Sequence, residues 1–308
     1  MTPVTEVEQN AYYDFVASMA PTFVPQELLQ PGELLWHYTN GNALLKILES
    51  KSLLATQVAC LNDSDEIMYA SHLLADAIKE VAASATEPEA KFLNGYFATD
   101  LDYSTPLAHF VTCFSRKKDD ISQWQAYCSG TENGYAIGCD PVGLKGMGDG
   151  LVAVNYEREV HDAAAKKVAE ATLRFYQEGL ELRPGESAEE WGAAFGQVWD
   201  EQITHLAPLL KDKCWAHEKE YRIIRLYRGD VDLENVVIFQ KDTMMTRHLR
   251  LHFIALQGKP EVLPIREIMI GPCRHPKTSA IAIGLALRKY GYTTPIPVTI
   301  SERRLRKT

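Results

Sequence analysis

The sequence lacks the signatures of several large protein classes. No apolar run approaches the ~18 residues of a membrane-spanning helix, so we expect no membrane segment. The 32 Lys and Arg are outnumbered by 41 Asp and Glu, which gives a net charge of −9. The chain therefore lacks the basic excess that a broad nucleic-acid-binding surface needs. With a hydrophobic share of 46% and no low-complexity stretch, it is typical of a globular protein.

Familiar motifs of nucleotide, nucleophile and metal sites are missing as well. There is no Gly-x-Gly-x-x-Gly, Walker loop, Gly-x-Ser-x-Gly or His-Glu-x-x-His. The six cysteines include no Cys-x-x-Cys pair, which suits reduced thiols in a cytosolic protein. The first residues lack a signal peptide's basic and apolar regions, so we expect a cytoplasmic location. His248 and His252 are four apart in what can be a helix, without a carboxylate or cysteine beside them, and we predict no metal site there.

Apolar runs and turn residues predict an alternation of strands and helices. We expect strands at 34–38, 53–56, 109–115, 134–140, 151–156, 220–226, 236–239, 265–270 and 297–300. Helices are expected at 43–50, 65–83, from 121 onward, 160–181, 187–210 and 278–290, with an irregular or helical bridge at 84–104. This mixture predicts the α+β class, with a mixed or antiparallel central sheet and flanking helices. We expect an N-terminal helical extension at 1–30 and a single domain at 31–308, with a helical insert at about 160–212.

The first candidate site residues end an expected buried strand. His37, Tyr38 and Thr39 precede a turn into a helix, a position from which side chains project into a cleft. The imidazole can hydrogen-bond a ribose hydroxyl, with Tyr38 or Thr39 lining the pocket. The alternative is a histidine of the core that has found a hydrogen-bond partner.

A second group follows the expected strand 109–115. Ser115 ends that strand, Arg116 begins a basic turn, and Trp124 and Tyr127 lie three apart on the next helix. The aromatics can form a stacking platform, with Arg116 meeting a phosphate. The alternatives are aromatics packed in the core and a solvated turn.

The third group consists of charged residues at the start of a strand. Glu218, Glu220 and Arg222 alternate along the chain, so on a strand they share one face, with the carboxylates about 7 Å apart. Such a cluster is typical of an active site, or else of a surface strand with an internal Glu/Arg pair. Asn62, Asp63 and Glu66 are either a ligand site or a helix cap with first-turn acids.

These segments, taken in order, resemble a known family. The motifs are Trp36-His37-Tyr38-Thr39, Leu61-Asn62-Asp63-x-x-Glu66, Cys113-Phe114-Ser115 with Trp124-x-x-Tyr127, Gly134-Tyr135-x-Ile137-Gly138-x-Asp140, Trp215-x-x-Glu218-x-Glu220-Tyr221-Arg222 and Glu267-Ile268-Met269-Ile270-Gly271-Pro272. From about residue 34 to 305 the chain resembles the bacterial domain-of-unknown-function family 2971.

A more distant resemblance is to ADP-ribosyltransferase folds. It is carried by a strand with His-Tyr-Thr, a helix and a Leu-rich strand. The resemblance implies that His37 holds the ribose of NAD, that Ser115 ends a second strand, and that Glu220 stabilises an oxocarbenium-like transition state. Glu218 would then engage the acceptor, and Arg116 or Arg222 the pyrophosphate of NAD. Ser115 is not followed by the Thr-Ser usual in those enzymes.

The expected function is therefore NAD-dependent ADP-ribosyl transfer, with NAD as substrate and an acceptor, protein or nucleic acid, that the sequence does not identify. A role as a bacterial toxin or defence effector would fit this chemistry. One alternative is a non-catalytic nucleotide-binding or sensor module. Another is metal-dependent nucleic-acid processing by Asp63, Glu66, Glu218 and Glu220. The sequence does not define the oligomeric state.

Overall fold

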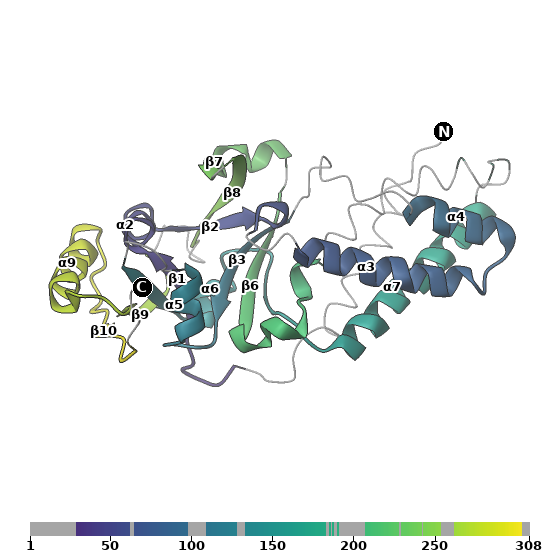
Figure 1. Ribbon diagram of the computed structural model, residues 1–308. Helices are drawn as coiled ribbons and strands as arrows, with labels where there is room; N and C mark the ends of the chain where they lie inside the picture. The colour runs from purple at the N-terminus through teal and green to yellow at the C-terminus, as the bar shows by residue number, and fades with distance from the viewer. Residues whose placement is uncertain are drawn as a thin grey trace. The chain divides into compact units, whose positions relative to one another are not determined.

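The computed structural model (Figure 1) describes residues 29–61, 65–97, 109–127, 133–182, 207–227, 229–241, 243–253 and 262–303, together with 185, 187 and 190. Most of the extension expected at 1–30 and of the helix expected at 187–210 lies outside these residues. The chain divides into two compact units, which we describe separately. The first comprises Met1–Gln26, Gln57–His109 and Val154–Ala216, and the second Glu27–Thr56, Phe110–Ala153 and His217–Thr308.

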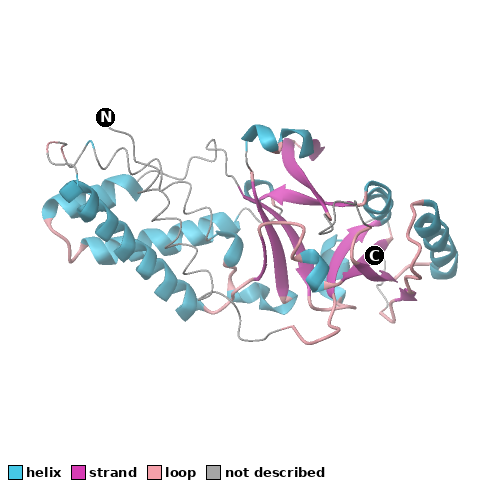
Figure 2. Cartoon of the chain, turned by 180° about the vertical axis from the view of Figure 1, so that it is seen from behind, coloured by secondary structure: helices cyan, strands magenta, loops and turns pink. Residues whose placement is uncertain are grey.

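The first unit is helical in its described part. Its α-helices are α3 (Asp65–Ala82), α4 (Glu87–Phe97) and α7 (Arg158–Leu182), with short 3₁₀ turns at Val58–Cys60 (η2) and Ala207–Leu209 (η3). Helices α3 and α7 lie side by side in both views (Figures 1 and 2). The expected helices at 65–83 and 160–181 are confirmed, and α4 occupies the stretch expected to form a bridge.

Polar and aromatic pairs join these helices. The Tyr69 hydroxyl on α3 lies 2.8 Å from Nδ1 of His161 on α7, and Nε2 of His161 lies 3.0 Å from the carbonyl oxygen of Asn155. Because a carbonyl accepts, Nε2 carries the hydrogen and Nδ1 accepts from the tyrosine. On α4, Phe92 stacks on Tyr176 of α7 with ring centroids 3.9 Å apart. These contacts fix the packing of α4 and α3 on α7.

The second unit contains the sheet, shown in magenta in Figure 2. Ten strands of the described residues form it, in the order β10-β9-β4-β1-β3-β2-β8-β7, with β6 beside β3 and β5 beside β6. Most recorded pairings are antiparallel, whereas β9 and β10 are parallel. The strands are β1 (Leu35–Asn40), β2 (Ser52–Gln57), β3 (His109–Ser115), β4 (Gly134–Cys139), β5 (Gly150–Ala153), β6 (Glu220–Leu226), β7 (Val236–Lys241), β8 (Met244–His252), β9 (Ile265–Ile270) and β10 (Val298–Ile300).

Strand β1 is held very differently on its two sides. It pairs with β4 through six consecutive residue pairs, from Leu35 with Cys139 to Asn40 with Gly134. With β3 it shares one register pair, Trp36 with Ser115. Strand β3 also neighbours β2 and β6, and since a strand has two edges, two of its three neighbours must share one edge. Strands β1 and β3 therefore meet at one end only.

Short helices cover the sheet, namely α2 (Gly41–Ser50), α5 (Ile121–Tyr127), α6 (Pro141–Leu144) and α9 (Pro276–Lys289). Helix α2 follows β1 directly because Asn40 is its N-cap, whose side chain accepts from the Ala43 amide at 2.8 Å. Its buried Leu44 and Leu48 join a core built from the inward faces of the strands, including Ile137 and Ile268. Burial of these side chains supplies most of the stabilising free energy.

One secondary-structure expectation is wrong. His248 and His252 lie on strand β8, not on a helix, where they pair with Thr56 and Ser52 of β2. The period of β8 is two at this end: Leu249 and Leu251 are buried while the residues between and after them are exposed. A spacing of four residues puts two side chains on one face of a strand as well as of a helix. The α+β class and the mixed, mostly antiparallel sheet are confirmed.

Candidate functional site

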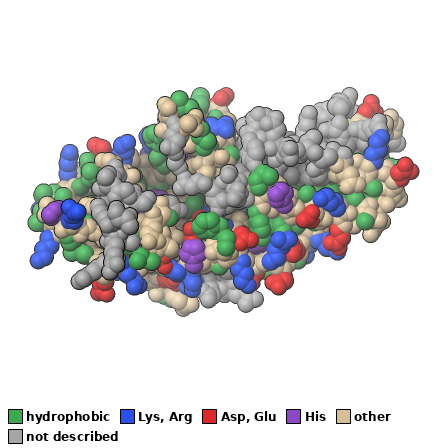
Figure 3. All heavy atoms as spheres, in the orientation of Figure 1, with side chains coloured by type: hydrophobic (Ala, Val, Ile, Leu, Met, Phe, Trp, Pro, Cys, Tyr) green, Lys and Arg blue, Asp and Glu red, His purple; other side chains and the backbone are tan. Residues whose placement is uncertain are grey.

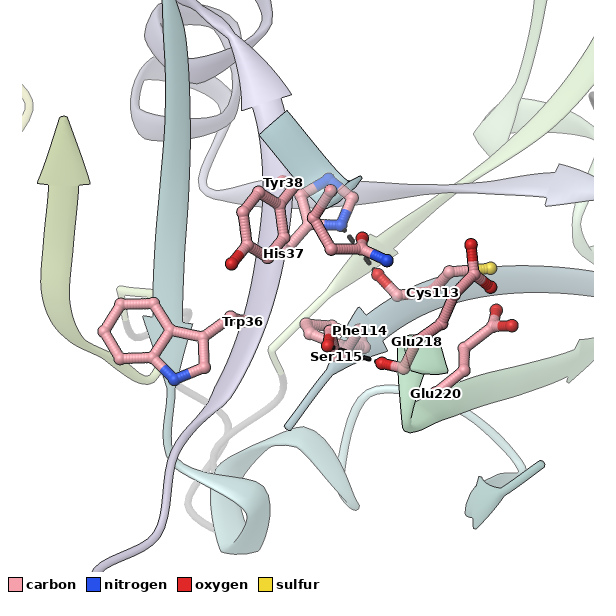
Figure 4. A pocket seen from close by; sticks show the side chains of 9 residues that line it. Trp36, His37, Tyr38, Cys113, Phe114, Ser115, Glu218 and Glu220 are labelled. Carbon is pink, nitrogen blue, oxygen red and sulfur yellow. Dashed lines mark hydrogen bonds between the residues drawn. The ribbon is translucent and has the colours of Figure 1, made fainter. Parts of the chain in front are cut away.

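A small pocket of about 50 Å³ opens in the second unit, where β1 and β3 part (Figure 4). Its walls come from five elements: β1, β3, α5, the 3₁₀ turn η4 (Lys213–Glu218) and β6. The lining residues are Trp36, His37, Tyr38, Cys113, Phe114, Ser115, Gln123, Glu218 and Glu220. Segments more than 180 residues apart in sequence thus meet at one site, and five of the ten residues expected at the active site line it.

His37 bridges the two strands with its side chain. Its Nδ1 lies 2.9 Å from the Cys113 carbonyl oxygen, drawn as a dashed line in Figure 4. The carbonyl can only accept, so Nδ1 carries the hydrogen and Nε2 of the neutral ring is an acceptor. Burial lowers the pKa of His37 below its usual 6.5, against the opposing effect of the Cys113 carbonyl. At neutral pH the ring is therefore uncharged, and Nε2 makes no hydrogen bond to another described residue.

Ser115 connects the end of β3 to the segment that carries the carboxylates. Its hydroxyl donates to the Glu218 carbonyl oxygen at 2.6 Å and accepts from the Lys117 amide at 3.0 Å. Next to this contact, the Arg116 amide donates to the Lys219 carbonyl oxygen at 3.1 Å. Although Ser115 lines the pocket, its hydroxyl hydrogen is thus committed to the protein backbone. The residue acts as a support for Glu218.

Both expected carboxylates reach the pocket, by a route the sequence did not indicate. Glu218 ends the turn η4 and Glu220 begins β6. Lys219 between them has a left-handed backbone, with φ 47°, which is uncommon for a residue with a side chain. The two glutamates are 7% and 6% exposed, and Figure 4 shows both side chains extending in the same direction from the backbone. The pocket therefore has two buried carboxylates at one wall.

Arg222 fixes the position of Glu220. Its Nε and Nη2 donate to the two carboxylate oxygens of Glu220 at 2.8 and 3.0 Å. The arginine side chain is 1% exposed, and Arg222 is not among the lining residues. The expectation that it shares a face with Glu220 is confirmed. A two-pronged pair of this kind holds a carboxylate in one orientation.

Arg116 does not line the pocket either. Its Nε lies 2.6 Å from Oε1 of Glu33, and its Nη2 donates to Oε2 at 2.9 Å. The hydrogen bond from Arg116 is the largest cause of the lowered pKa of Glu33. Lys117 and Lys118 in the same loop each bind a carboxylate as well. The basic turn is therefore neutralised by acidic partners.

The aromatic residues separate into a wall and a support. Tyr38 lines the pocket, and its hydroxyl donates to the Lys117 carbonyl oxygen at 2.7 Å. Trp124 is fully buried behind it, with ring centroids 4.6 Å apart at 70°, and its Nε1 donates to Asp119 at 2.7 Å. Thr39 is buried outside the pocket. Trp124 thus belongs to the core and not to a stacking platform.

Some candidates cannot be placed. Asn62 and Asp63 lie outside the described residues, as do the side chains of Glu66 and Tyr127. Within the described part of the chain, no group of three or more His, Cys, Asp or Glu side chains is arranged to hold a metal ion. No described helix combines the length and apolar character needed to cross a bilayer.

Sequence reasoning missed four lining residues: Trp36, Cys113, Phe114 and Gln123. The first three are neighbours of expected residues in β1 and β3. Gln123 was missed for a different reason: the aromatic spacing on its helix drew the prediction to Trp124 and Tyr127. The available signal was a polar residue in the first turn of a short helix that follows a strand and a loop.

Comparison with known proteins gives one match. The family model described as "Protein of unknown function (DUF2971)" matches residues 123–223. No curated protein and no solved structure matches the chain, so these comparisons lend no support to a similarity with ADP-ribosyltransferases. The matched stretch begins at Gln123 and includes Glu218, Glu220 and Arg222. The resemblance expected over about residues 34–305 is therefore shown for residues 123–223, where the chain is similar to the DUF2971 family.

Proposed function

We propose that the pocket binds the nicotinamide–ribose end of NAD and that the protein transfers ADP-ribose from it. One observation carries the proposal: a neutral His37 from β1 and the buried Glu218 and Glu220 from η4 and β6 line the same pocket. Nε2 of His37 can accept a hydrogen bond from a ribose hydroxyl, and the two carboxylates can stabilise the positive charge that develops at C1′ of that ribose.

The charge of the site favours this substrate. Two buried carboxylates, those of Glu218 and Glu220, line the pocket, and the guanidinium of Arg222 holds the second of them in place. The nicotinamide ring of NAD is a cation that leaves as a neutral molecule, while positive charge moves to the ribose. A fixed negative charge near that ribose stabilises the transition state. Because Arg222 already orients Glu220, little reorganisation is needed when the charge develops.

The size of the pocket limits what enters. A volume of about 50 Å³ corresponds to roughly four water molecules at ~10–15 Å³ each. One edge of a ring and part of a ribose fill such a space, whereas the phosphates and the adenine must lie outside. Among the described residues on the face shown in Figure 3, basic and acidic side chains are interspersed.

The chemical step follows from this placement. The C1′–N bond breaks, its electron pair goes to the pyridinium nitrogen, and nicotinamide leaves. An oxygen or nitrogen of the acceptor, or water, then bonds to C1′. Glu220 stabilises the positive ribose, His37 accepts a hydrogen bond from a ribose hydroxyl through Nε2, and Glu218 takes the proton of the attacking group.

The test is nicotinamide release and label transfer. The protein is incubated with labelled NAD in water and with cell extract, and Glu220→Gln and Glu218→Gln are compared with Glu49→Gln, which changes an exposed glutamate of α2. We expect Glu220→Gln to lower the rate by about 100- to 1,000-fold and Glu49→Gln to leave it unchanged. Thermal unfolding shows which variants fold. Absence of both NAD binding and nicotinamide release in the unmodified protein would refute the proposal.

A second candidate function is favoured by the Arg222–Glu220 pair itself. A carboxylate satisfied by a guanidinium at 2.8 and 3.0 Å can serve to shape a binding site without taking part in catalysis. A nucleotide-binding or sensor module would be stabilised by NAD in thermal unfolding and would release no nicotinamide. The same assay therefore separates the two functions.

A further inference from the structure

Gln123 is a buried polar residue of the pocket that the mechanism above does not use. It is 5% exposed and lies on α5 between Ser122 and the core residue Trp124. Its side-chain amide makes no hydrogen bond to any other residue of the described part of the chain. Buried amides are nearly always hydrogen-bonded. Its place in the pocket lining points to a bound ligand as the partner.

The position of Gln123 is fixed from both sides. Before it, the Asp120 carboxylate accepts from the Ser122 amide at 2.9 Å and from the Gln123 amide at 3.4 Å. After it, Trp124 is fully buried and is tied to Asp119 at 2.7 Å. Helix α5 can therefore neither turn nor slide without breaking these contacts. The side chain is presented to the pocket in a defined place, as specific recognition requires.

The other polar groups of the pocket supply mainly acceptors. The hydrogens of His37 Nδ1, the Ser115 hydroxyl and the Tyr38 hydroxyl are directed to the backbone carbonyls of Cys113, Glu218 and Lys117. The carboxylates of Glu218 and Glu220 are acceptors. The Gln123 amide places an N–H donor next to a carbonyl acceptor and carries no charge.

We propose that Gln123 determines substrate specificity by binding the carboxamide of the nicotinamide ring. This inference rests on the proposed function. Two amides complement each other, donor to acceptor and acceptor to donor. A ring that carries a carboxylate instead loses the donor and brings a further negative charge beside Glu218 and Glu220. The pocket therefore selects NAD over nicotinic acid adenine dinucleotide, which differs from NAD in that group alone.

The experiment measures nicotinamide or nicotinate release, and binding by calorimetry, for both dinucleotides. The unmodified protein should favour NAD by at least about tenfold, since a site built to hydrogen-bond a group rejects an analogue that lacks it. Gln123→Leu should bring the ratio to within about threefold. Gln123→Glu keeps an acceptor for the carboxamide and adds a negative charge, so the ratio should rise. Gln125→Leu, two residues along on the exposed side of α5, should leave the ratio unchanged.

The outcomes separate this inference from the proposed function. If NAD is cleaved and the ratio is the same in both Gln123 variants as in the unmodified protein, the assignment of Gln123 is wrong while ADP-ribosyl transfer stands. If the unmodified protein neither binds nor cleaves NAD, the proposed function is wrong and the assignment of Gln123 fails with it. Opposite shifts of the ratio in Gln123→Leu and Gln123→Glu would establish the assignment, because a purely structural role predicts the same direction for both. Thermal unfolding confirms that each variant compared is folded.

Discussion

Replacing Arg222 by methionine tests whether Glu220 is held in a desolvated ion pair. The side chain of Arg222 is 1% exposed and that of Glu220 is 7% exposed, and two hydrogen bonds of 2.8 and 3.0 Å join them. Methionine retains much of the side-chain volume and removes the charge. The buried carboxylate then loses its guanidinium, and breaking a buried pair in this way costs about 3–5 kcal/mol of unfolding free energy.

The matched control is Arg266→Met. Arg266 also binds a carboxylate, that of Asp140 at 2.9 Å, but the two side chains are 59% and 29% exposed. A solvated pair contributes about 0–1 kcal/mol. Urea unfolding of the two variants and the unmodified protein, followed by circular dichroism, gives both differences in one series.

A third variant completes the cycle. The double variant Glu220→Gln/Arg222→Met removes both charges of the ion pair, so it should recover part of the stability lost in Arg222→Met. The stability losses of the two single variants should therefore not add. A loss of less than about 1 kcal/mol in Arg222→Met, equal to that of Arg266→Met, would contradict the reasoning. It would mean that water reaches the pair and that Glu220 is not preorganised for charge stabilisation.

Three other predictions follow. Gly138→Ala should cost about 1–3 kcal/mol of stability by overpacking, because a Cβ there would lie 2.8 Å from ring carbons of Trp36; an unchanged urea midpoint would contradict it. Burial lowers the pKa of His37 in the folded chain below the ordinary value of 6.5. When the solution pH falls below 6.5, His37 is therefore protonated in the unfolded chain before it is protonated in the folded chain. Stability should fall as the pH drops from 7 to 5, less steeply in His37→Gln; parallel curves would refute this. Burial raises the pKa of Cys139 to about 12, so iodoacetamide at pH 8 should label the exposed Cys214 and spare Cys139 until urea is added, as mass spectrometry can show.

Two of the strands that line the site, at residues 109–115 and 220–226, were expected with the bounds that the structure has, and so was strand 265–270 elsewhere in the sheet. The strand expected at 34–38 runs instead from Leu35 to Asn40. β-Branched and aromatic runs without breakers leave few alternatives. His37 and Glu220 were expected in a cleft because strand ends present side chains there; Glu220 does begin β6, whereas His37 lies in the middle of β1 and Glu218 on the turn η4.

What stayed hidden depends on partners distant in sequence. The acidic partner of Arg116 is Glu33, on another segment, so the basic turn was interpreted as a phosphate site. The left-handed Lys219 turns Glu218 and Glu220 into one pocket, and no local pattern predicts it, because lysine has no preference for that backbone. Gln123 acquires significance only through the pocket it lines.

The single register pair between β1 and β3 gives the sheet a seam. Along that seam the two strands are joined by an imidazole instead of a ladder of main-chain bonds. A ligand that enters between β1 and β3 meets the hydrogen bond of His37 to Cys113, whereas the six-pair ladder of β1 with β4 lies along the opposite edge of β1. Ligand binding at this seam therefore leaves the main-chain pairing that anchors β1 in the sheet untouched.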